Sequence, residues 1–206
     1  MVSSRDRLLA AAAREFAARG YDGASVDRIA RAARLNKAMI YYHFKSKAGL
    51  YRAIVRDVFE AVLAALNAGN DAAAEPEARI ERFVRVIAGV AATRPHFPPI
   101  WLAEFAGGLR HVDEATLRTA IQVVGFLRAI LADGERAGRF RPLPSILMHV
   151  GIVAPLMFFA VSLAARERLS RAGAPSARDL TLDAMVQHVI ESSLGVLRFK
   201  EGESHA

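Results

Sequence analysis

Apolar residues recur every three or four positions along almost the whole of this 206-residue chain. That spacing places them on one face of an α-helix, and no segment shows the strict alternation of a half-buried strand. Hydrophobic residues make up 53% of the chain and Ala is abundant, so there is material for a core and a composition that favours helices. The pattern predicts an all-α fold.

Clusters of Gly, Pro and Asn interrupt the pattern, and such residues end helices or form turns. They divide the chain into about nine predicted helices. In chain order these cover residues 4–19, 26–32, 37–43, 47–67, 75–93, 100–107, 112–137, 144–169 and 177–199.

The turn-rich stretch 67–71 marks the expected domain junction. We expect a small N-terminal domain over residues 1–50, called the head below. The helix at about 47–67 connects it to a larger helical domain over residues 51–206.

Positive charge is concentrated in the head. Residues 1–50 hold ten basic and four acidic residues, a net charge of +6, whereas the whole chain carries +7. A concentrated positive field attracts polyanions through the release of their counterions. Nucleic acid is therefore one candidate partner, and simple solubility is the alternative explanation.

Two short predicted helices, separated by a break at residues 33–35, follow the longer first helix of the head. This order predicts a helix-turn-helix, in which a three-helix core holds one helix for the major groove of DNA. The third helix needs only Ile40 and Phe44 for its buried contact. Polar and aromatic residues on the rest of this short helix leave a face free for a partner.

Residues 7–54 resemble the DNA-binding domain of the tetracycline-repressor (TetR) family. The matching stretches are FAARGY at 16–21, SVDRIA at 25–30 and LNKAMIYYHFKSK at 35–47. The resemblance implies an all-helical regulator, a repressor, that binds a palindromic operator in double-stranded DNA as a homodimer. It also implies a variable C-terminal domain that holds a small effector and releases the operator.

By position, the resemblance assigns roles within the head. The residues that meet base edges would be Lys37, Ala38, Met39 and Tyr41. Those that hold phosphates would be Tyr42, His43 and Lys47, with Ser25 and Arg28 at the start of the second helix. An alternative for the two tyrosines is that they cover the core of the head.

The chain departs from the family at Arg34, where the family usually has Gly. A residue other than Gly at positive φ costs roughly 1–2 kcal/mol. Either the turn avoids that conformation or the fold tolerates the strain.

Residues 145–165 carry no charge and are long enough to cross a bilayer. One interpretation is a membrane-tethered DNA-binding regulator with its span there. The other pairs this segment with the amphipathic helix at 177–199, so that the eighth and ninth predicted helices of two subunits form a four-helix bundle. The resemblance implies this dimer, without a membrane.

An effector pocket is expected among the fifth to eighth predicted helices, where the resemblance implies it. Apolar and aromatic residues with a few polar groups line such pockets. The candidates are Phe97, Trp101, Phe105, Phe126, His149, Met157 and Phe158. The scarcity of Arg and Lys in these segments favours a largely apolar effector, and plain core packing is the alternative role of each residue.

Catalytic signatures are missing from the sequence. There is no nucleophile elbow, dinucleotide-binding or P-loop motif, and no two histidines are spaced i, i+4 for a metal. The chain also lacks Cys, which fits a reducing compartment. We therefore expect a cytoplasmic protein with no metal or cofactor, and a helical enzyme remains the remote alternative.

Overall fold

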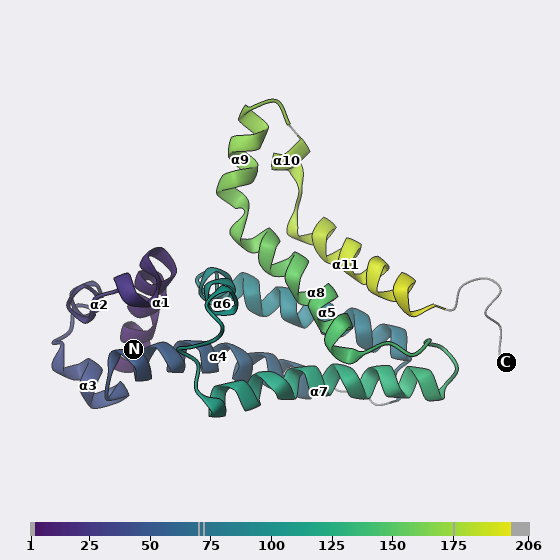
Figure 1. The fold of residues 1–206 in the computed structure, drawn as a ribbon, viewed down its shortest axis with the longest axis horizontal. Coiled ribbons are helices and arrows are strands. Elements are labelled where there is room, and N and C mark those ends of the chain that lie inside the picture. The colour runs from purple at the N-terminus through teal and green to yellow at the C-terminus, as the bar shows by residue number, and fades with distance from the viewer. Residues whose placement is uncertain (1–2, 70, 72, 175, 199–206) are drawn as a thin grey trace. The chain divides into compact units, whose positions relative to one another are not determined.

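The described part of the chain is helical, as the spacing of its apolar residues predicts (Figure 1). The computed structural model describes residues 3–69, 71, 73–174 and 176–198, and no strand forms within them. The chain divides into two compact units: Met1–Ala61 with Arg94–Ala120, and Val62–Thr93 with Ile121–Ala206. We call them unit 1 and unit 2. Unit 1 includes the predicted head, and Asn70 of the expected junction lies outside the described residues.

Three helices form the N-terminal part of unit 1: α1 (Ser4–Gly23), α2 (Val26–Ala33) and α3 (Ala38–Phe44). Their shared core is made of apolar side chains that are at most 7% exposed: Leu8, Ala12, Phe16, Ile29, Ala30, Ile40 and Phe44. The sequence predicted these boundaries closely. The predicted stop of the first helix at Gly20 also corresponds to a kink, where φ is 67° and ψ is 177°.

Side chains fix where α3 and α4 (Lys47–Ala68) begin. The Asn36 Oδ1 accepts the N–H of Ala38 at 2.8 Å. The Ser46 Oγ accepts the N–H of Gly49 at 2.9 Å, as expected for an N-cap. Ser25 also occupies an N-cap position, before α2, but its hydroxyl accepts no N–H from the first turn. The start of α2 is therefore not fixed by the side chain at its N-cap.

The turn between α2 and α3 adopts the strained conformation at Arg34, with φ 53° and ψ 46°. This is the left-handed region, so the strain is tolerated rather than avoided. The Arg7 guanidinium of α1 donates to the carbonyl oxygens of Ala33 at 2.6 Å and Arg34 at 3.3 Å. The N–H of Leu35 also closes a bond to the Ala30 carbonyl at 3.0 Å. These bonds hold the turn although it lacks Gly.

The rest of unit 1 consists of the first part of α4, all of α6 (Phe97–Ala106) and the start of α7 (Glu114–Arg136). Asp113 begins α7, because its Oδ1 accepts the N–H of Thr116 at 2.9 Å. The same carboxylate lies 3.4 Å from the Arg56 guanidinium of α4. The hydrogen bond with Thr116 lowers the pKa of Asp113, with the Arg56 charge adding to it.

Unit 2 contains the ends of α4 and α7 and five further helices: α5 (Pro76–Thr93), α8 (Ser145–Val161), α9 (Leu163–Arg171), α10 (Ser176–Asp179) and α11 (Leu182–Leu197). α11 packs against α5 and α8. Their core includes Phe83, Ile152 and Val189, each at most 2% exposed. The Arg79 guanidinium is bonded to Asp133 at 2.6 Å and so ties α5 to α7.

The predicted single helix at 144–169 is two helices. α8 ends at Val161, the hydroxyl of the following Ser162 donates to the Phe159 carbonyl at 3.0 Å, and α9 turns away by 63°. The uncharged run 145–165 is therefore not one straight helix. The predicted helix at 177–199 is likewise split into α10 and α11, and its end at Phe199 lies outside the described residues.

By length and composition, α7 could cross a membrane, and α8 with α9 could do so only as a broken span. Helices of this kind also occur inside proteins that never enter a membrane. They are therefore weak support for the membrane-tethered interpretation.

Candidate nucleic-acid interface

The outward face of α3 carries the residues predicted to meet DNA. Ile40 and Phe44 are buried, as expected, so the remaining side chains point away from the core. Tyr41 is 46% exposed and Tyr42 is 70% exposed, and neither covers the core of the head. Exposed positions also include Lys37 and Ala38, whereas Met39, His43 and Lys47 are half-buried.

Lys37 stands directly before α3 and forms an ion pair across the helix-turn-helix. Its Nζ lies 2.9 Å from the Oδ1 of Asp27, in the first turn of α2. The hydrogen bond with Asp27 and the charge of that carboxylate raise the pKa of the Lys37 ammonium. Lys37 is therefore cationic at neutral pH but already has a partner in the free protein.

Arg28 fastens α2 to α1 in the free protein. Its Nε donates to Glu15 at 2.6 Å, and the backbone N–H of Ser25 donates to the same carboxylate at 3.3 Å. Burial alone would raise the pKa of Glu15, but these bonds outweigh it and lower the pKa. Arg28 and Ser25 thus position the start of α2, where the sequence predicted phosphate contacts.

Lys47 lies at the start of α4, over an aromatic ring. Its Nζ is 4.7 Å from the centroid of Tyr21 and 3.4 Å from the carbonyl oxygen of Asp22. The attraction between an ammonium and a ring face holds the side chain in place without cancelling its charge. Earlier in the chain, at the end of α3, His43 has a buried Nε2 with no hydrogen-bond partner among the described residues.

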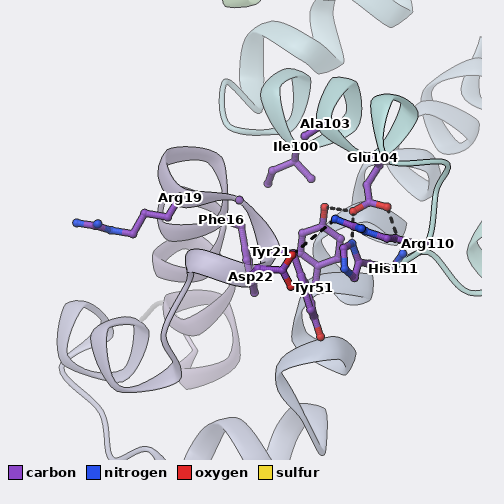
Figure 2. Close-up of a pocket in the computed structure, with 12 residues that line it drawn as sticks. Phe16, Arg19, Tyr21, Asp22, Tyr51, Ile100, Ala103, Glu104, Arg110 and His111 are labelled. Atoms are coloured by element: carbon purple, nitrogen blue, oxygen red, sulfur yellow. Dashed lines mark hydrogen bonds and ion pairs between the residues drawn. The ribbon is translucent and has the colours of Figure 1, made fainter.

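Unit 1 also contains a buried polar network centred on Glu104 of α6 (Figure 2). Glu104 is 4% exposed, and its carboxylate accepts the hydroxyl of Tyr51 at 2.7 Å. The Nδ1 of His111 lies 2.8 Å from this carboxylate, and the backbone N–H of His111 donates to it at 3.3 Å. Burial, together with the bond to Glu104, raises the pKa of Tyr51 well above its ordinary value.

Aromatic rings connect this network to the end of α1. The ring of Tyr21 stacks on His111 with 4.0 Å between centroids and meets Tyr51 edge-on at 5.1 Å. Tyr21 is also the ring beneath Lys47. The sequence pattern did not predict that Tyr21, Tyr51 and His111 meet around Glu104. No spacing links them, because they come from α1, α4 and the loop before α7.

A cavity of about 200 Å³ lies beside the network within unit 1 (Figure 2). It is lined by Phe16, Arg19, Gly20, Tyr21, Asp22, Tyr51, Ile100, Ala103, Glu104, Gly107, Arg110 and His111. At its edge, Arg110 pairs with Asp22 at 3.6 Å, whereas Arg19 points away from the other labelled side chains. The space suits only a small ligand, and none of the seven predicted effector residues lines it.

The predicted effector residues fall in both units. In unit 1, Phe97 and Trp101 are buried and stack at 5.8 Å, and the exposed Phe105 meets Trp101 edge-on at 5.0 Å. In unit 2, Met157 is buried and Phe126 is half-buried, whereas Phe158 is 68% exposed. A shared pocket for all seven therefore stays a prediction.

His149 of α8 is the polar member of that predicted set. Its Nδ1 is buried with no hydrogen-bond partner among the described residues, and its ring faces Phe83 of α5 at 6.4 Å. Burial lowers the pKa of His149. A neutral ring next to an apolar core could donate or accept one hydrogen bond to a ligand.

Comparison with known proteins decides the family. Residues 8–54 match the family model described as "Bacterial regulatory proteins, tetR family". These residues belong to the TetR family. The chain is 29% identical over 158 residues to the HTH-type transcriptional repressor NicS of Pseudomonas putida, covering 76% of this chain and 74% of NicS.

Two further comparisons extend this TetR-family assignment. The HTH-type transcriptional regulator RutR of Escherichia coli (strain K12) is 25% identical over 141 residues, covering 68% of this chain and 66% of RutR. A bacterial regulatory protein of the tetR family from Rhodococcus RHA1 has a TM-score of 0.76 at 20% identity, covering 97% of this chain and 100% of that one. The latter shows that the fold is shared along the chain, and the family match together with the sequence relatives supports a TetR-type regulator.

Removing one donor from the network tests its contribution to folding. Tyr51→Phe keeps the packed ring but leaves the Glu104 carboxylate without the hydroxyl, so we expect a loss of about 1–3 kcal/mol in the free energy of unfolding. Tyr42→Phe removes the same hydroxyl at a site that is 70% exposed and should change stability by less than about 0.5 kcal/mol. Urea unfolding measures both, and equal effects would show that Glu104 does not need Tyr51.

Proposed function

We propose that this TetR-family chain is a repressor that binds a palindromic operator as a homodimer and releases it when a small, largely apolar effector binds. The observation that carries the proposal is the free outward face of α3, next to a helix-turn-helix core that uses only Ile40 and Phe44 of that helix. The relatives whose names identify them as regulators and repressors support the same class.

The DNA-binding half of the proposal rests on charge and shape. A helix fits the major groove, and Lys37, Ala38, Met39 and Tyr41 lie at the start and along the outward side of α3. Later in the chain, towards the start of α4, lie Tyr42, His43 and Lys47. These are the positions at which phosphates would flank the groove. Two such heads in a dimer would read two half-sites about one helical turn apart.

Two lysine variants separate phosphate contacts from base contacts. Lys47→Ala should weaken binding to every duplex alike and reduce the slope of log affinity against log salt by roughly one. Lys37→Ala should instead change which bases are preferred at one position of each half-site. Selection of duplexes from a random pool, followed by a salt series, measures both effects.

Arg85→Ala is the matched control, because Arg85 lies in α5 and pairs only with Glu81 among the described contacts. It should leave DNA binding unchanged. If both lysine variants bind all duplexes as the parent does, α3 is not the helix that enters the groove.

A stripe of exposed apolar side chains on α8 supports a dimer. Ile146, Val150 and Phe158 follow one another at helical spacing and are 51–68% exposed in the isolated chain. We propose that α8 and α11 of a second copy cover this stripe, as the resemblance implies. Exposure also favours the dimer contact over the effector pocket as the place of Phe158.

Part of the apolar face expected to form this dimer packs within the chain instead. On α11, Val186, Val189 and Ile190 are at most 5% exposed because they meet α5 and α8 of the same chain. Val196 remains 45% exposed and is free for a second copy. The proposed contact therefore uses mainly α8, with the outer side of α11.

Phe158→Glu tests the dimer, since it places a charge in the exposed stripe. We expect monomers at micromolar concentration in analytical ultracentrifugation, because burying an unpaired carboxylate costs several kcal/mol. Ala78→Glu adds the same charge at an exposed position of α5 and should remain dimeric. A monomeric parent protein would refute the dimer and the two-headed operator with it.

The effector half of the proposal centres on α6. Phe97, Trp101 and Phe105 form an aromatic cluster with Phe59 of α4, whose ring meets Trp101 at 4.9 Å. α6 also carries Glu104, which is bonded to α4 and to the loop before α7. A ligand that moves α6 would therefore act on Tyr51 and His111, and through Tyr21 on Lys47. Such a shift of populations requires the ligand to prefer one arrangement of α6.

Trp101 is the chain's only tryptophan, and its fluorescence reports on this region. An apolar effector should change that fluorescence, raise the melting temperature and weaken operator binding over the same range of concentration. Phe105→Ala should reduce all three responses at little cost in folding, since Phe105 is 58% exposed. Ile121→Ala, at an exposed site of α7, is the control. If a compound changes fluorescence but not operator binding, it is not the effector.

A further inference from the structure

One carboxylate lies next to the groove-facing lysine of the head. Asp27, in the first turn of α2, is 61% exposed and its Oδ1 is 2.9 Å from the Nζ of Lys37, which is 51% exposed. An ion pair as open to water as this contributes little to folding. The stability gained from the ion pair itself is therefore small, although a carboxylate in the first turn also favours the start of α2.

The other acidic residues in the described part of the head have different partners. Glu15 is largely buried and bonded to Arg28, and Asp22 pairs with Arg110. Asp6 is bonded to Ser3 at the start of α1. Asp27 is thus the acidic residue of the head that an ion pair connects to a predicted base-reading side chain.

The pair changes what Lys37 gains from different contacts on DNA. If Lys37 moves to a phosphate, it releases a counterion but leaves the Asp27 carboxylate unpaired beside a polyanion. A base edge instead offers neighbouring hydrogen-bond acceptors, such as N7 and O6 of guanine. The ammonium has three donors, so it can bond that edge and keep one donor on Asp27.

We propose that Asp27 is a specificity-determining residue that keeps Lys37 from phosphates on non-operator DNA and positions its ammonium towards a guanine edge. This inference rests on the proposed DNA-binding function and deepens it. Asp27 acts through Lys37 and lowers non-specific affinity more than operator affinity.

Asp27→Asn in the full chain tests the proposal, because it removes the charge and keeps the size of the side chain. Affinity for a selected operator and for a non-operator duplex of equal length is measured over a salt series. We expect non-operator affinity to rise several-fold, with a salt slope steeper by about one unit. The ratio of operator to non-operator affinity should fall about tenfold, as for the loss of one good base contact.

Three further variants isolate the mechanism. Asp57→Asn in α4 makes the same change of charge away from α3, at a carboxylate paired with Arg94, and should leave the affinity ratio near that of the parent. In a Lys37→Ala background, Asp27→Asn should have no further effect on the ratio. Asp27→Glu keeps the charge and should restore most of the specificity, which also shows that the fold tolerates change at this site.

The outcomes separate this inference from the function on which it rests. If the parent selects no duplex, the proposed function fails. If the parent is selective but Asp27→Asn leaves its affinity ratio unchanged, only the role of Asp27 fails. The role of Asp27 also fails if Asp27→Asn still changes the affinity ratio in the Lys37→Ala background. The carboxylate would then act through the total charge of the head and not through Lys37.

Discussion

The carboxylate of Glu104 is the contact on which the arrangement of unit 1 depends. It is buried, so it has lost water and would cost several kcal/mol without compensation. Tyr51 from α4 and His111 from the loop before α7 supply that compensation, and Tyr21 from the end of α1 packs on both. A half-satisfied network of this kind would be worse than an apolar core. The helices that supply its members are therefore held in one arrangement.

The cations of the head that are predicted to meet DNA are already held by other groups of the free protein. In the free protein Arg28 is bonded to Glu15, Lys37 to Asp27, and Lys47 lies over a ring. Such contacts leave the long-range field of the head in place, since the net charge is unchanged, but they fix the directions of the side chains. Attraction to DNA of any sequence therefore depends on the total charge of the head. Recognition of one sequence depends on where each cation is held.

Unit 2 uses its apolar surface in two ways that the sequence pattern does not distinguish. The inner side of α11 forms a core with α5 and α8, whereas the stripe on α8 that includes Val150 and Phe158 has no cover in the isolated chain. Exposed apolar patches of this kind commonly mark interaction sites. The bend at Ser162 separates this stripe from the charged α9 and explains how an uncharged run can belong to a helix pair rather than a bilayer span.

The sequence by itself determined the all-α fold, the helix-turn-helix and the outward face of α3. These follow from periodicity, breakers such as Gly20 and caps such as Ser46, all of which act over a few residues. Only the tertiary structure decided that Arg34 tolerates a left-handed turn, because Arg7, 27 positions away, holds the neighbouring carbonyls. It also decided the partners of Glu104, which come from segments far apart in the chain. Local spacing encodes which face of a helix is apolar, but which distant groups meet there depends on how the helices pack.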